Sequence, residues 1–352
     1  MGRGEPIHLA VVFGGRSPEH PVSLVSARHV LAHLEGEDFV LHPVGIARDG
    51  AWHLGEDARR LLEGHAPEGP GGPPRLPEET DCVFPLVHGP GGEDGSLQGY
   101  LETLGLPFVG SGSLGSALAM DKVVSKRVFR DASIPVVNGS EVSRREWRRD
   151  PGAVLRRVLQ ERGLPAFVKP AALGSSVGIH RCTDEGELRA GLEDALGFGP
   201  RALVEPALRV RELEIAILDG EPPLVSPPGE IVPRDWYDYR AKYEEDSAEL
   251  RVPAPDLPPR MVEHLQELAW RAFRALRLRG LARVDFFLDR DRGRPALNEV
   301  NTLPGFTRIS MYPRLMEHCG VPPARLCRRL VALALREARD LPSPAPTPRA
   351  PA

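Results

Sequence analysis

Two apolar runs separated by a short polar turn, in the last third of the chain, constrain the fold most strongly. The runs are Leu281–Leu288 and Pro295–Val300, and the turn between them is Asp289–Gly293. This pattern predicts a β-hairpin. Because side chains alternate between the two faces of a strand, the polar residues of the hairpin can be assigned to one face or the other.

Four polar residues of this hairpin are expected on the same face. Arg283 and Asp285 share a face, as do Glu299 and Asn301, and a turn centred near Asp291 would place Arg283 opposite Glu299. Asp, Glu and Asn supply the hard oxygen atoms that Mg²⁺ takes together with phosphate oxygens. The face therefore predicts a magnesium–phosphate site, and the alternative is a solvated face with one ion pair.

Length and composition set the class of protein. A chain of 352 residues is too long for one simple core, so two or three lobes are expected. The net charge of −4, without a dense basic block, argues against a nucleic-acid binder. No window approaches ~18 uninterrupted apolar residues, so no membrane span is expected. The four cysteines show no CxxC spacing, which predicts reduced thiols in a cytoplasmic protein.

Two glycine-rich segments near the N-terminus follow predicted buried strands. The run Ile7–Phe13 leads into a double glycine, and Asp81–Val87 leads into the segment HGPGGEDG, which begins at His88. Glu19 lies in the first of these strand-to-helix loops, where open α/β sheets place their ligands. The alternative for Glu19 is a solvated loop residue. These features predict a nucleotide-fold-like first lobe.

A lysine followed by a glycine–serine loop predicts a phosphate-binding hairpin in the middle of the chain. Lys169 ends a predicted strand, and the loop ALGSSVG, with Ser175 and Ser176, precedes a second strand that starts at Ile179. Backbone N–H groups, hydroxyls and a lysine together suit a phosphate group. A flexible linker of small residues is the alternative.

Further predictions concern one glutamate, one loop and three helices. Glu205 ends a strand at a lobe junction, where it could accept from an adenine amino group or a ribose hydroxyl, although surface glutamates are commoner. The polar-aromatic loop 236–243 has the character of a lid. The predicted helices are one amphipathic helix within 147–163, a helix over Pro258–Arg279 and a final helix over Pro322–Arg339.

Eight segments occur in one order, from near the N-terminus to about residue 315. They are GGRSPEHPVS, HGPGGEDGSLQGYLE, the step Met-Asp121-Lys122, FVKPAALGSSVG, the pair Glu205…Arg-Glu212, YDYRAKY, RVDFFL and NEVNTLPGFT. Together they resemble the motifs of the ATP-grasp carboxylate–amine ligases, and closely those of the D-alanine–D-alanine ligases. One departure is Arg240, where a member of that family is expected to carry Glu.

The resemblance implies an α/β fold with α+β lobes, namely an ATP-grasp fold preceded by an N-terminal Rossmann-like domain. The implied parts are a substrate-binding domain over 1–121, a central ATP-grasp lobe over 122–208, a C-terminal lobe with the metal and catalytic residues over 209–340, and a disordered tail over 341–352. The implied cofactors are ATP and two Mg²⁺ ions, for which Mn²⁺ could substitute.

The resemblance also implies a role for each candidate residue. The metal ligands would be Asp285, Glu299 and Asn301, with Glu299 shared by both ions. ATP would be held by Lys122, Lys169, Ser176, Glu205 at the adenine, Glu212 at the ribose and Lys242 at the γ-phosphate. The catalytic group would comprise Glu19 at the first D-alanine ammonium, Ser175 and Tyr243 locking two loops, and Arg283 with the N–H of Gly305 at the oxyanion. The remaining substrate contacts would be His88, Ser310 and Met311.

The function implied is ATP-dependent ligation of two D-alanines through an acyl phosphate, for peptidoglycan precursors, in the cytoplasm and as a homodimer. Two alternatives stay open at this point. One is a carboxylate–amine ligase of the same fold with other substrates, and the other is a nucleotide-binding protein that has lost catalysis. Tyr243 favours D-alanine over D-lactate as the second substrate.

Overall fold

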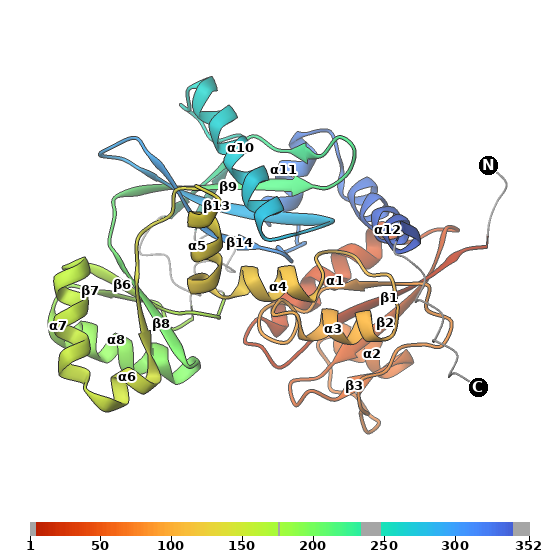
Figure 1. The fold of residues 1–352 in the computed structure, drawn as a ribbon. Helices are drawn as coiled ribbons and strands as arrows, with labels where there is room; N and C mark the ends of the chain where they lie inside the picture. The colour runs from red at the N-terminus through yellow and green to blue at the C-terminus, as the bar shows by residue number, and fades with distance from the viewer. Residues whose placement is uncertain (1–4, 175–176, 234–247, 341–352) are drawn as a thin grey trace, which may run out of the picture.

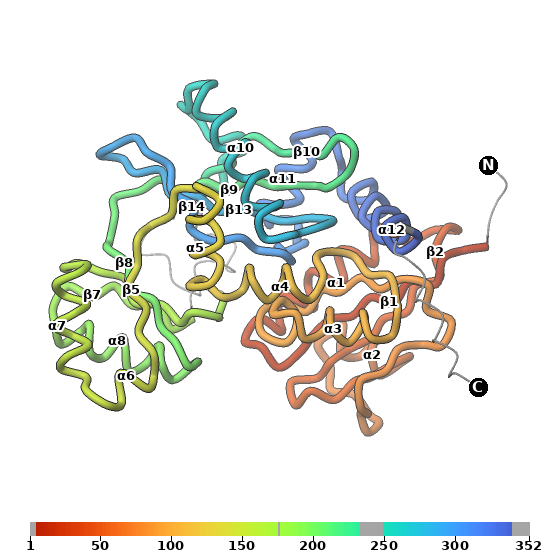
Figure 2. Tube along the Cα trace, viewed as in Figure 1, coloured from red at the N-terminus to blue at the C-terminus, as the bar shows by residue number. Residues whose placement is uncertain are grey.

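The computed structural model describes residues 5–174, 177–233 and 248–340, which form three β-sheets with helices packed against them (Figure 1). The sheets belong to an N-terminal domain, a central lobe and a C-terminal lobe. In Figure 2 the central lobe, in yellow and green, projects to one side, and the blue C-terminal chain returns to the N-terminal domain. Among the described helices, none has the length and apolar character needed to cross a membrane.

The N-terminal sheet confirms the predicted Rossmann-like character. Its strand order is β3-β2-β1-β4, and β1 pairs in parallel with both β2 and β4. Val11 faces the core shared with α1 and α12, whereas Val12 faces the core on the other side, so the apolar run of β1 is buried on both faces. The elements are β1 (Ile7–Gly14), α1 (His20–Leu34), β2 (Phe39–Ile46), β3 (Trp52–His53), α2 (Gly55–Glu63), β4 (Cys82–Pro85), α3 (Ser96–Thr103) and α4 (Ser113–Met120).

The double glycine after β1 is required by the turn that follows. Gly14 and Gly15 have φ angles of 93° and 101°, and a Cβ on Gly14 would lie 2.1 Å from the carbonyl oxygen of Ile46. Only glycine therefore fits at position 14. The turn leads directly to Glu19, which precedes α1, and the neighbouring strand β4 leads to His88. The two predicted loops thus meet at one edge of the sheet.

The central lobe is an antiparallel sheet in the order β5-β8-β6-β7, with helices packed on one face. The single amphipathic helix predicted within 147–163 is wrong, because the structure has two helices there. Asp150 ends the first and caps the second by accepting from the N–H of Ala153, and Pro151 starts a new helix because it has no N–H to continue the old one. The elements are β5 (Ser140–Ser143), α6 (Arg144–Arg149), α7 (Pro151–Arg162), β6 (Ala166–Pro170), β7 (His180–Cys182), α8 (Glu185–Phe198) and β8 (Arg201–Pro206).

The C-terminal lobe is built on the order β12-β11-β9-β13-β14, with β10 paired to β9. The predicted helix over Pro258–Arg279 is correct in place but too long, because the chain leaves it at Leu276 and takes a positive φ at Arg277. The elements are β9 (Val210–Leu218), β10 (Leu224–Val225), β11 (Gly229–Pro233), β12 (Ala248–Arg251), α10 (Pro259–Ala275), β13 (Leu281–Asp289), β14 (Pro295–Asn301), α11 (Met311–His318) and α12 (Pro323–Asp340).

Two helices tie the parts together across the lobe limits. Helix α5 (Lys122–Asp131) buries Phe129 in the core beneath β9 and α10, so the start of the second sequence segment packs on the C-terminal sheet. Helix α12 packs beside α1 in a core that also contains Phe306 and Tyr312. Cys82, Cys182, Cys319 and Cys327 are all free thiols in the structure.

Candidate active site

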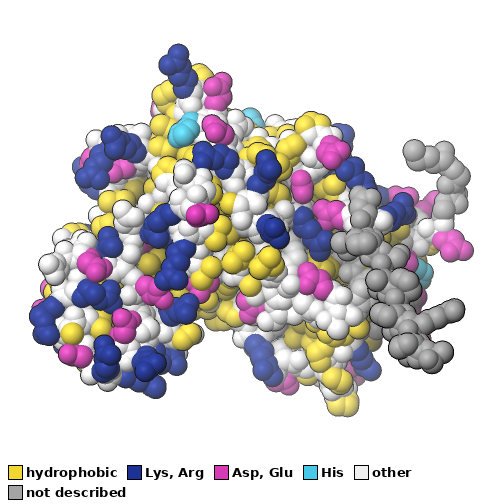
Figure 3. Space-filling view, viewed as in Figure 1, with side chains coloured by type: hydrophobic (Ala, Val, Ile, Leu, Met, Phe, Trp, Pro, Cys, Tyr) yellow, Lys and Arg dark blue, Asp and Glu magenta, His cyan; other side chains and the backbone are white. Residues whose placement is uncertain are grey.

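A cavity of about 570 Å³ lies between the N-terminal domain, the start of α5 and the face of the C-terminal sheet. On the surface seen in Figure 3, the molecule is hollowed between the central lobe and the N-terminal domain, with positive and negative side chains interspersed. The predicted site residues on the cavity wall are Glu19, His88, Lys122, Glu212, Arg283, Asp285, Glu299, Asn301, Gly305, Ser310 and Met311. The structure therefore brings together groups separated by almost the whole sequence.

The predicted β-hairpin is present, but its predicted register is wrong. Arg283 pairs with Asn301, and Asp285 pairs with Glu299. The difference has two causes. The turn is centred midway between Leu288 and Pro295, which pair with each other, and not at Asp291; in addition, Asn298 forms a β-bulge. The resulting shift of two residues keeps all four side chains on one face, because side chains alternate with a period of two. The chemistry inferred from the shared face is therefore unaffected.

A third carboxylate extends the acidic row onto the next strand. Asp285 pairs with Glu299 on one side and with Glu214 of β9 on the other, so the three carboxylates lie side by side across three strands. All three line the cavity. Sequence reasoning missed Glu214, although it lies two positions after Glu212 and so shares its face of the strand.

Arg283 is held between two of these carboxylates. Its Nε and Nη2 donate to the two oxygens of Asp285 at 2.8 and 2.7 Å, and Nε lies 3.2 Å from Oε2 of Glu214. Burial by itself would lower the pKa of Arg283, but Asp285 and Glu214 outweigh it and raise the pKa well above its usual value. The guanidinium is therefore a permanent positive charge on the cavity wall.

The oxygen atoms of Asp285, Glu299 and Asn301 fit a magnesium site in type, and the three residues line one cavity. Oδ1 of Asn301 accepts from the N–H of Leu303 at 3.0 Å, and Oε2 of Glu299 lies 3.2 Å from Nζ of Lys122. Each carboxylate or amide oxygen has two lone pairs, so these contacts leave electron pairs for a cation. Hard oxygen donors on one rigid strand pair are the ligands that Mg²⁺ prefers.

Lys122 joins the acidic row to the central lobe. Asp121 caps α5 by accepting from the N–H groups of Val123 and Val124, which fixes Lys122 at the first helical position. From there Nζ donates to the carbonyl oxygen of Leu173 at 2.8 Å and contacts Glu299. Leu173 belongs to the predicted phosphate loop, so Lys122 lies where a phosphate held by that loop and by metal ions would need a cation.

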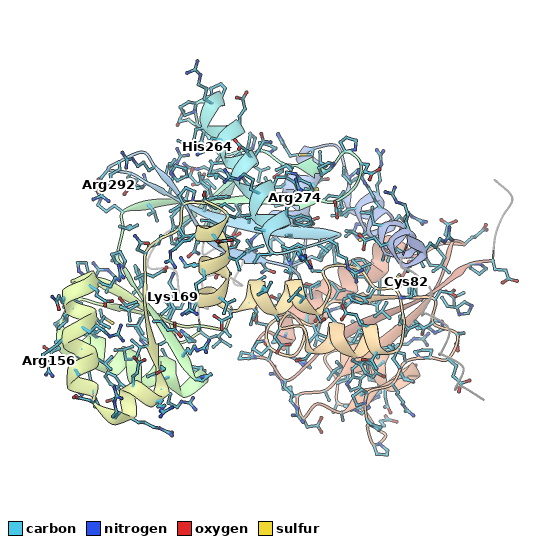
Figure 4. All side chains as sticks on the ribbon, in the orientation of Figure 1. Cys82, Arg156, Lys169, His264, Arg274 and Arg292 are labelled. Atoms are coloured by element: carbon cyan, nitrogen blue, oxygen red, sulfur yellow. The ribbon has the colours of Figure 1, made fainter. Side chains whose placement is uncertain are left out.

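Lys169 and Glu205 lie behind the cavity wall rather than on it. Nζ of Lys169 donates to Oε2 of Glu205 at 2.8 Å and to Oδ1 of Asn298, on the wall, at 3.4 Å. The other carboxylate oxygen, Oε1, lies 2.5 Å from Nζ of Lys126 on α5. Figure 4 shows Lys169 on the side of the central lobe that faces α5. Sequence reasoning missed Lys126, although its spacing of four from Lys122 puts both on one helix face.

These three charges shift one another's pKa values. Burial would raise the pKa of Glu205, yet the two lysines lower it to about 2. Burial would lower the pKa of Lys169, yet Glu205 raises it. For Lys126 burial prevails over Glu205, and its pKa is lowered. The glutamate is therefore ionised at every physiological pH.

Glu19 and His88 lie together on the N-terminal side of the cavity. A Cβ on Gly174 would lie 3.2 Å from Oε2 of Glu19, so the carboxylate faces the start of the predicted phosphate loop. Nδ1 of His88 donates to the carbonyl oxygen of Leu303, 3.1 Å away, and Nε2 lies 3.0 Å from Oγ of Ser26. Nothing in the sequence of α1 distinguished Ser26 from other small residues on the helix.

The segment 303–311 closes the cavity on the C-terminal side. The N–H of Phe306 donates to Oγ of Ser26 at 3.3 Å, which ties this segment to α1. A Cβ on Gly305 would lie 2.8 Å from Oγ of Ser310, so glycine is needed for that close approach. Ser310 precedes α11, and its Oγ accepts from the N–H of Thr307 at 3.1 Å. The predicted oxyanion and carboxylate contacts are thus neighbours.

Four predicted site residues lie outside the described residues. They are Ser175, Ser176, Lys242 and Tyr243, together with the departure Arg240 and the tail 341–352. The roles given to them therefore stay predictions. The described ends of the gaps, at Gly174 and at β11, both border the cavity, since Gly174 and Ile231 line it.

Comparisons with known proteins agree on one family. The family models described as "D-ala D-ala ligase N-terminus" and "D-ala D-ala ligase C-terminus" match residues 8–111 and 128–332. A D-alanine–D-alanine ligase of Deinococcus radiodurans is 47% identical over 94% of this chain and 98% of that protein. One from Geobacillus thermodenitrificans is 42% identical over 94% and 96%.

Solved structures give the same result at the level of the fold. The D-alanine–D-alanine ligase of Coxiella burnetii superimposes with a TM-score of 0.82 and 34% identity, over 96% of each chain. The VanG D-Ala:D-Ser ligase of Enterococcus faecalis superimposes with a TM-score of 0.81 and 32% identity, over 94% of this chain and 99% of that one. The likeness covers all three lobes.

Proposed function

The chain belongs to the D-alanine–D-alanine ligase family, which has the ATP-grasp fold, and we propose that the cavity described above is its active site. The protein joins two D-alanines to D-alanyl-D-alanine for peptidoglycan synthesis, with release of ADP and phosphate. The observation that supports the cavity is the row of three carboxylates with Arg283 and Lys122 beside it.

The reaction proceeds in two steps, because a free carboxylate is a poor electrophile. The carboxylate of the first D-alanine takes the γ-phosphoryl group of ATP, and ADP leaves. The amine of the second D-alanine then attacks the acyl carbon, loses a proton and expels phosphate. The first step brings a carboxylate to the anionic phosphates, and the second develops an oxyanion beside the phosphate group, so the catalytic requirement is mainly positioning and charge stabilisation.

Asp285, Glu299 and Asn301 are the proposed ligands of two Mg²⁺ ions, for which Mn²⁺ could substitute. When bound, the ions neutralise charge on the phosphates during transfer. Lys122 lies beside Glu299 and would contact the same phosphates. Glu212, which lines the cavity on β9, is the proposed ribose contact. Lys169, Ser176 and Lys242 complete the proposed phosphate contacts.

Arg283 and the N–H of Gly305 are proposed to stabilise the oxyanion that forms when the amine attacks. Asp285 and Glu214 fix the guanidinium in advance, so no reorganisation is needed when the charge develops. Glu19 would bind the ammonium group of the first D-alanine, with His88 near the same substrate. Ser310 and Met311 would bind the carboxylate of the second.

Phosphate release tests the activity directly. The protein with ATP and Mg²⁺ should release phosphate when D-alanine is added, and D-alanyl-D-alanine should accumulate. Release that is equal with L-alanine would contradict the assignment. A panel of other amino acids in the same assay separates this activity from that of a ligase with different substrates.

The second substrate is proposed to be D-alanine rather than D-lactate. A hydroxyl is a far weaker nucleophile than an amine unless a group in the site activates it, and the loop 236–243 contains no histidine to do so. Competition between D-alanine, D-lactate and D-serine at neutral pH, read by mass spectrometry, checks this. Predominant ester product would refute the role given to Tyr243, and a serine product would place the chain nearer the D-Ala:D-Ser ligases.

The remaining proposals concern the oligomeric state, the cellular location and the domain limits. We expect a homodimer that acts in the cytoplasm, and light scattering of the purified protein measures the mass in solution. The domain limits 1–121, 122–208 and 209–340, followed by the tail 341–352, are likewise proposed. The packing of α5 on the C-terminal sheet means that limited proteolysis near 121 should not release a separate central lobe.

A further inference from the structure

Lys126 is one of the most deeply buried charged side chains among the described residues, with a relative exposure of 1%. It lies on α5, one helical turn after Lys122, and both lysines project from the same helix face. An ammonium group in such a place needs a permanent anionic partner, because its desolvation would otherwise be prohibitive. The buried ammonium group of Lys126 has such a partner, and the mechanism proposed above gives this lysine no role.

Its partner is Glu205, which it shares with Lys169. Glu205 is only 2% exposed, and each of its two oxygens faces a different lysine, Oε1 toward Lys126 at 2.5 Å and Oε2 toward Lys169 at 2.8 Å. A carboxylate so buried is costly unless a cation and hydrogen bonds accompany it. In the structure, the ammonium groups of Lys126 and Lys169 both contact this carboxylate.

The two lysines differ in what else they can reach. Nζ of Lys169 also contacts Oδ1 of Asn298 on the cavity wall and lies 5.6 Å from the centre of the Phe287 ring, which lines the same cavity. Nζ of Lys126 has instead the carbonyl oxygen of Val137, at 3.5 Å. Lys169 is thus adjacent to the nucleotide side, whereas Lys126 faces the protein interior.

We propose that Lys126 is a positioning residue that keeps Glu205 charged and in place for the adenine amino group, while Lys169 exchanges Glu205 for the phosphates. This inference rests on the proposed function, because it adds to it the adenine contact that the resemblance to the family implies for Glu205. The amino group of adenine needs a carboxylate oxygen that accepts, and the phosphates of the same nucleotide compete with Oε2 for the ammonium group of Lys169. Lys126 on Oε1 then remains the one described cation in contact with the buried carboxylate.

The consequence is a preference for adenine over guanine. Adenine presents an amino donor where guanine presents a carbonyl acceptor. An ionised carboxylate attracts the first and repels the second. Without Lys126, a buried Glu205 separated from Lys169 would take up a proton, and a protonated carboxyl can also donate. Loss of Lys126 should therefore weaken ATP binding and reduce discrimination against GTP, without altering the reacting groups.

The test compares ATP with GTP in the D-alanine-dependent phosphate-release assay for Lys126→Met and Lys126→Arg. Lys126→Met should raise the KM for ATP about tenfold or more, in line with the loss of one charged hydrogen bond. The ATP-to-GTP ratio of kcat/KM should fall by a similar factor, whereas kcat at saturating ATP changes much less. Lys126→Arg keeps the charge and should restore most of the preference.

The matched control is Arg271→Met. Arg271 of α10 donates to the carbonyl oxygen of Ala132 at 2.7 Å and so anchors the C-terminal end of α5. Neither group of this hydrogen bond contacts Glu205 in the structure. This variant should lower the melting temperature yet keep the ATP-to-GTP ratio. An equal loss of the ratio in Arg271→Met would show that Lys126 only holds the helix in place.

A double variant keeps the inference testable if Lys126→Met folds poorly. Lys126→Met combined with Glu205→Gln removes both charges of the pair, and it should show the same ATP-to-GTP ratio as Glu205→Gln alone. Additive losses would overturn the inference, as would an unchanged ratio in Lys126→Met. Absence of D-alanine-dependent phosphate release by the unaltered protein would instead overturn the proposed function, so the two failures are distinguishable.

Discussion

Two clusters of opposite charges lie one turn apart along the same face of α5, and they differ in access to the cavity. The hairpin cluster comprises Glu214, Arg283, Asp285, Glu299 and Asn301, and Lys122 reaches it from the helix. The buried cluster comprises Lys126, Lys169 and Glu205. The side chain of Glu299 is 27% exposed, whereas that of Glu205 is 2% exposed.

The difference shows how similar groups serve different tasks. In the hairpin cluster, the partly exposed carboxylate of Glu299 can exchange one cation for another, as metal binding and phosphoryl transfer require. In the buried cluster, removing both lysines would leave the charge of Glu205 without solvent or a partner, so one cation has to stay. Charged groups that line the cavity suit the reaction itself, whereas charged groups buried behind its wall suit the recognition of one group of the ligand. Substitutions in the two clusters should therefore have different kinetic signatures.

The largest expected effect is that of Glu299→Gln. Its carboxylate is the proposed ligand shared by both metal ions, whose charges are the largest in the site. We expect kcat to fall by about 10³-fold, the upper end for removal of one group that stabilises charge in an active site. Steady-state phosphate release at saturating ATP and D-alanine measures it. Restoration of the rate at high Mg²⁺ would support a weakened metal site.

Glu205→Gln in the buried cluster provides the contrast. Its effect should be mainly a KM for ATP raised about tenfold or more, with a much smaller change in kcat, because the contact is to the adenine and not to the reacting atoms. Parallel kinetics on both variants decide the matter. Comparable losses in kcat would show that the metal ligands are assigned wrongly.

Arg283→Lys should have the next largest effect. Lysine keeps the positive charge but cannot bridge Asp285 with two donors, as the guanidinium does at 2.8 and 2.7 Å. We expect a fall in kcat of about 10²-fold, with little change in the KM for ATP. Glu214→Gln is the milder companion, since it leaves the Asp285 contact intact. A larger loss in Glu214→Gln than in Arg283→Lys would contradict the order of importance.

The smallest expected effect is on stability at acid pH. The pKa of Glu205 is lowered from 4.5 to about 2, so its ionised form stabilises the folded state fully above pH 4.5. That contribution is lost as the pH falls from 4.5 toward about 2. The free energy of unfolding, measured by urea at several pH values in this window, should therefore fall more steeply for the unaltered protein than for Glu205→Gln. Parallel curves would mean that Glu205 is less strongly paired than the distances indicate.

Local sequence patterns predicted the elements best where two signals agreed. The hairpin β13–β14 combined apolar runs with a polar turn, and α10 has helical apolar periodicity from its first turn, although its end was predicted too late. The region 147–163 failed because its apolar periodicity continues across Asp150 and Pro151, where the backbone breaks the helix. The hairpin register was wrong because the sequence locates neither the centre of the turn nor the bulge at Asn298.

The sequence by itself determined which chemical groups the protein has and which of them share a face. Periods of two and of four put Arg283 with Asp285, and Lys122 with Lys126, whatever the rest of the chain does. The order of the eight motifs also sufficed to indicate the family.

Only the tertiary structure decided which groups meet and which are closed from solvent. Glu214, Asp285 and Glu299 form a row because β9, β13 and β14 are neighbours, and the pairing of β9 with β13 joins segments more than 60 residues apart. Glu205 became a buried charge between two lysines because α5 packs on the C-terminal sheet and so brings Lys126 to the central lobe. Desolvation depends on the whole packed environment of a group, and a local pattern of residues carries no record of it.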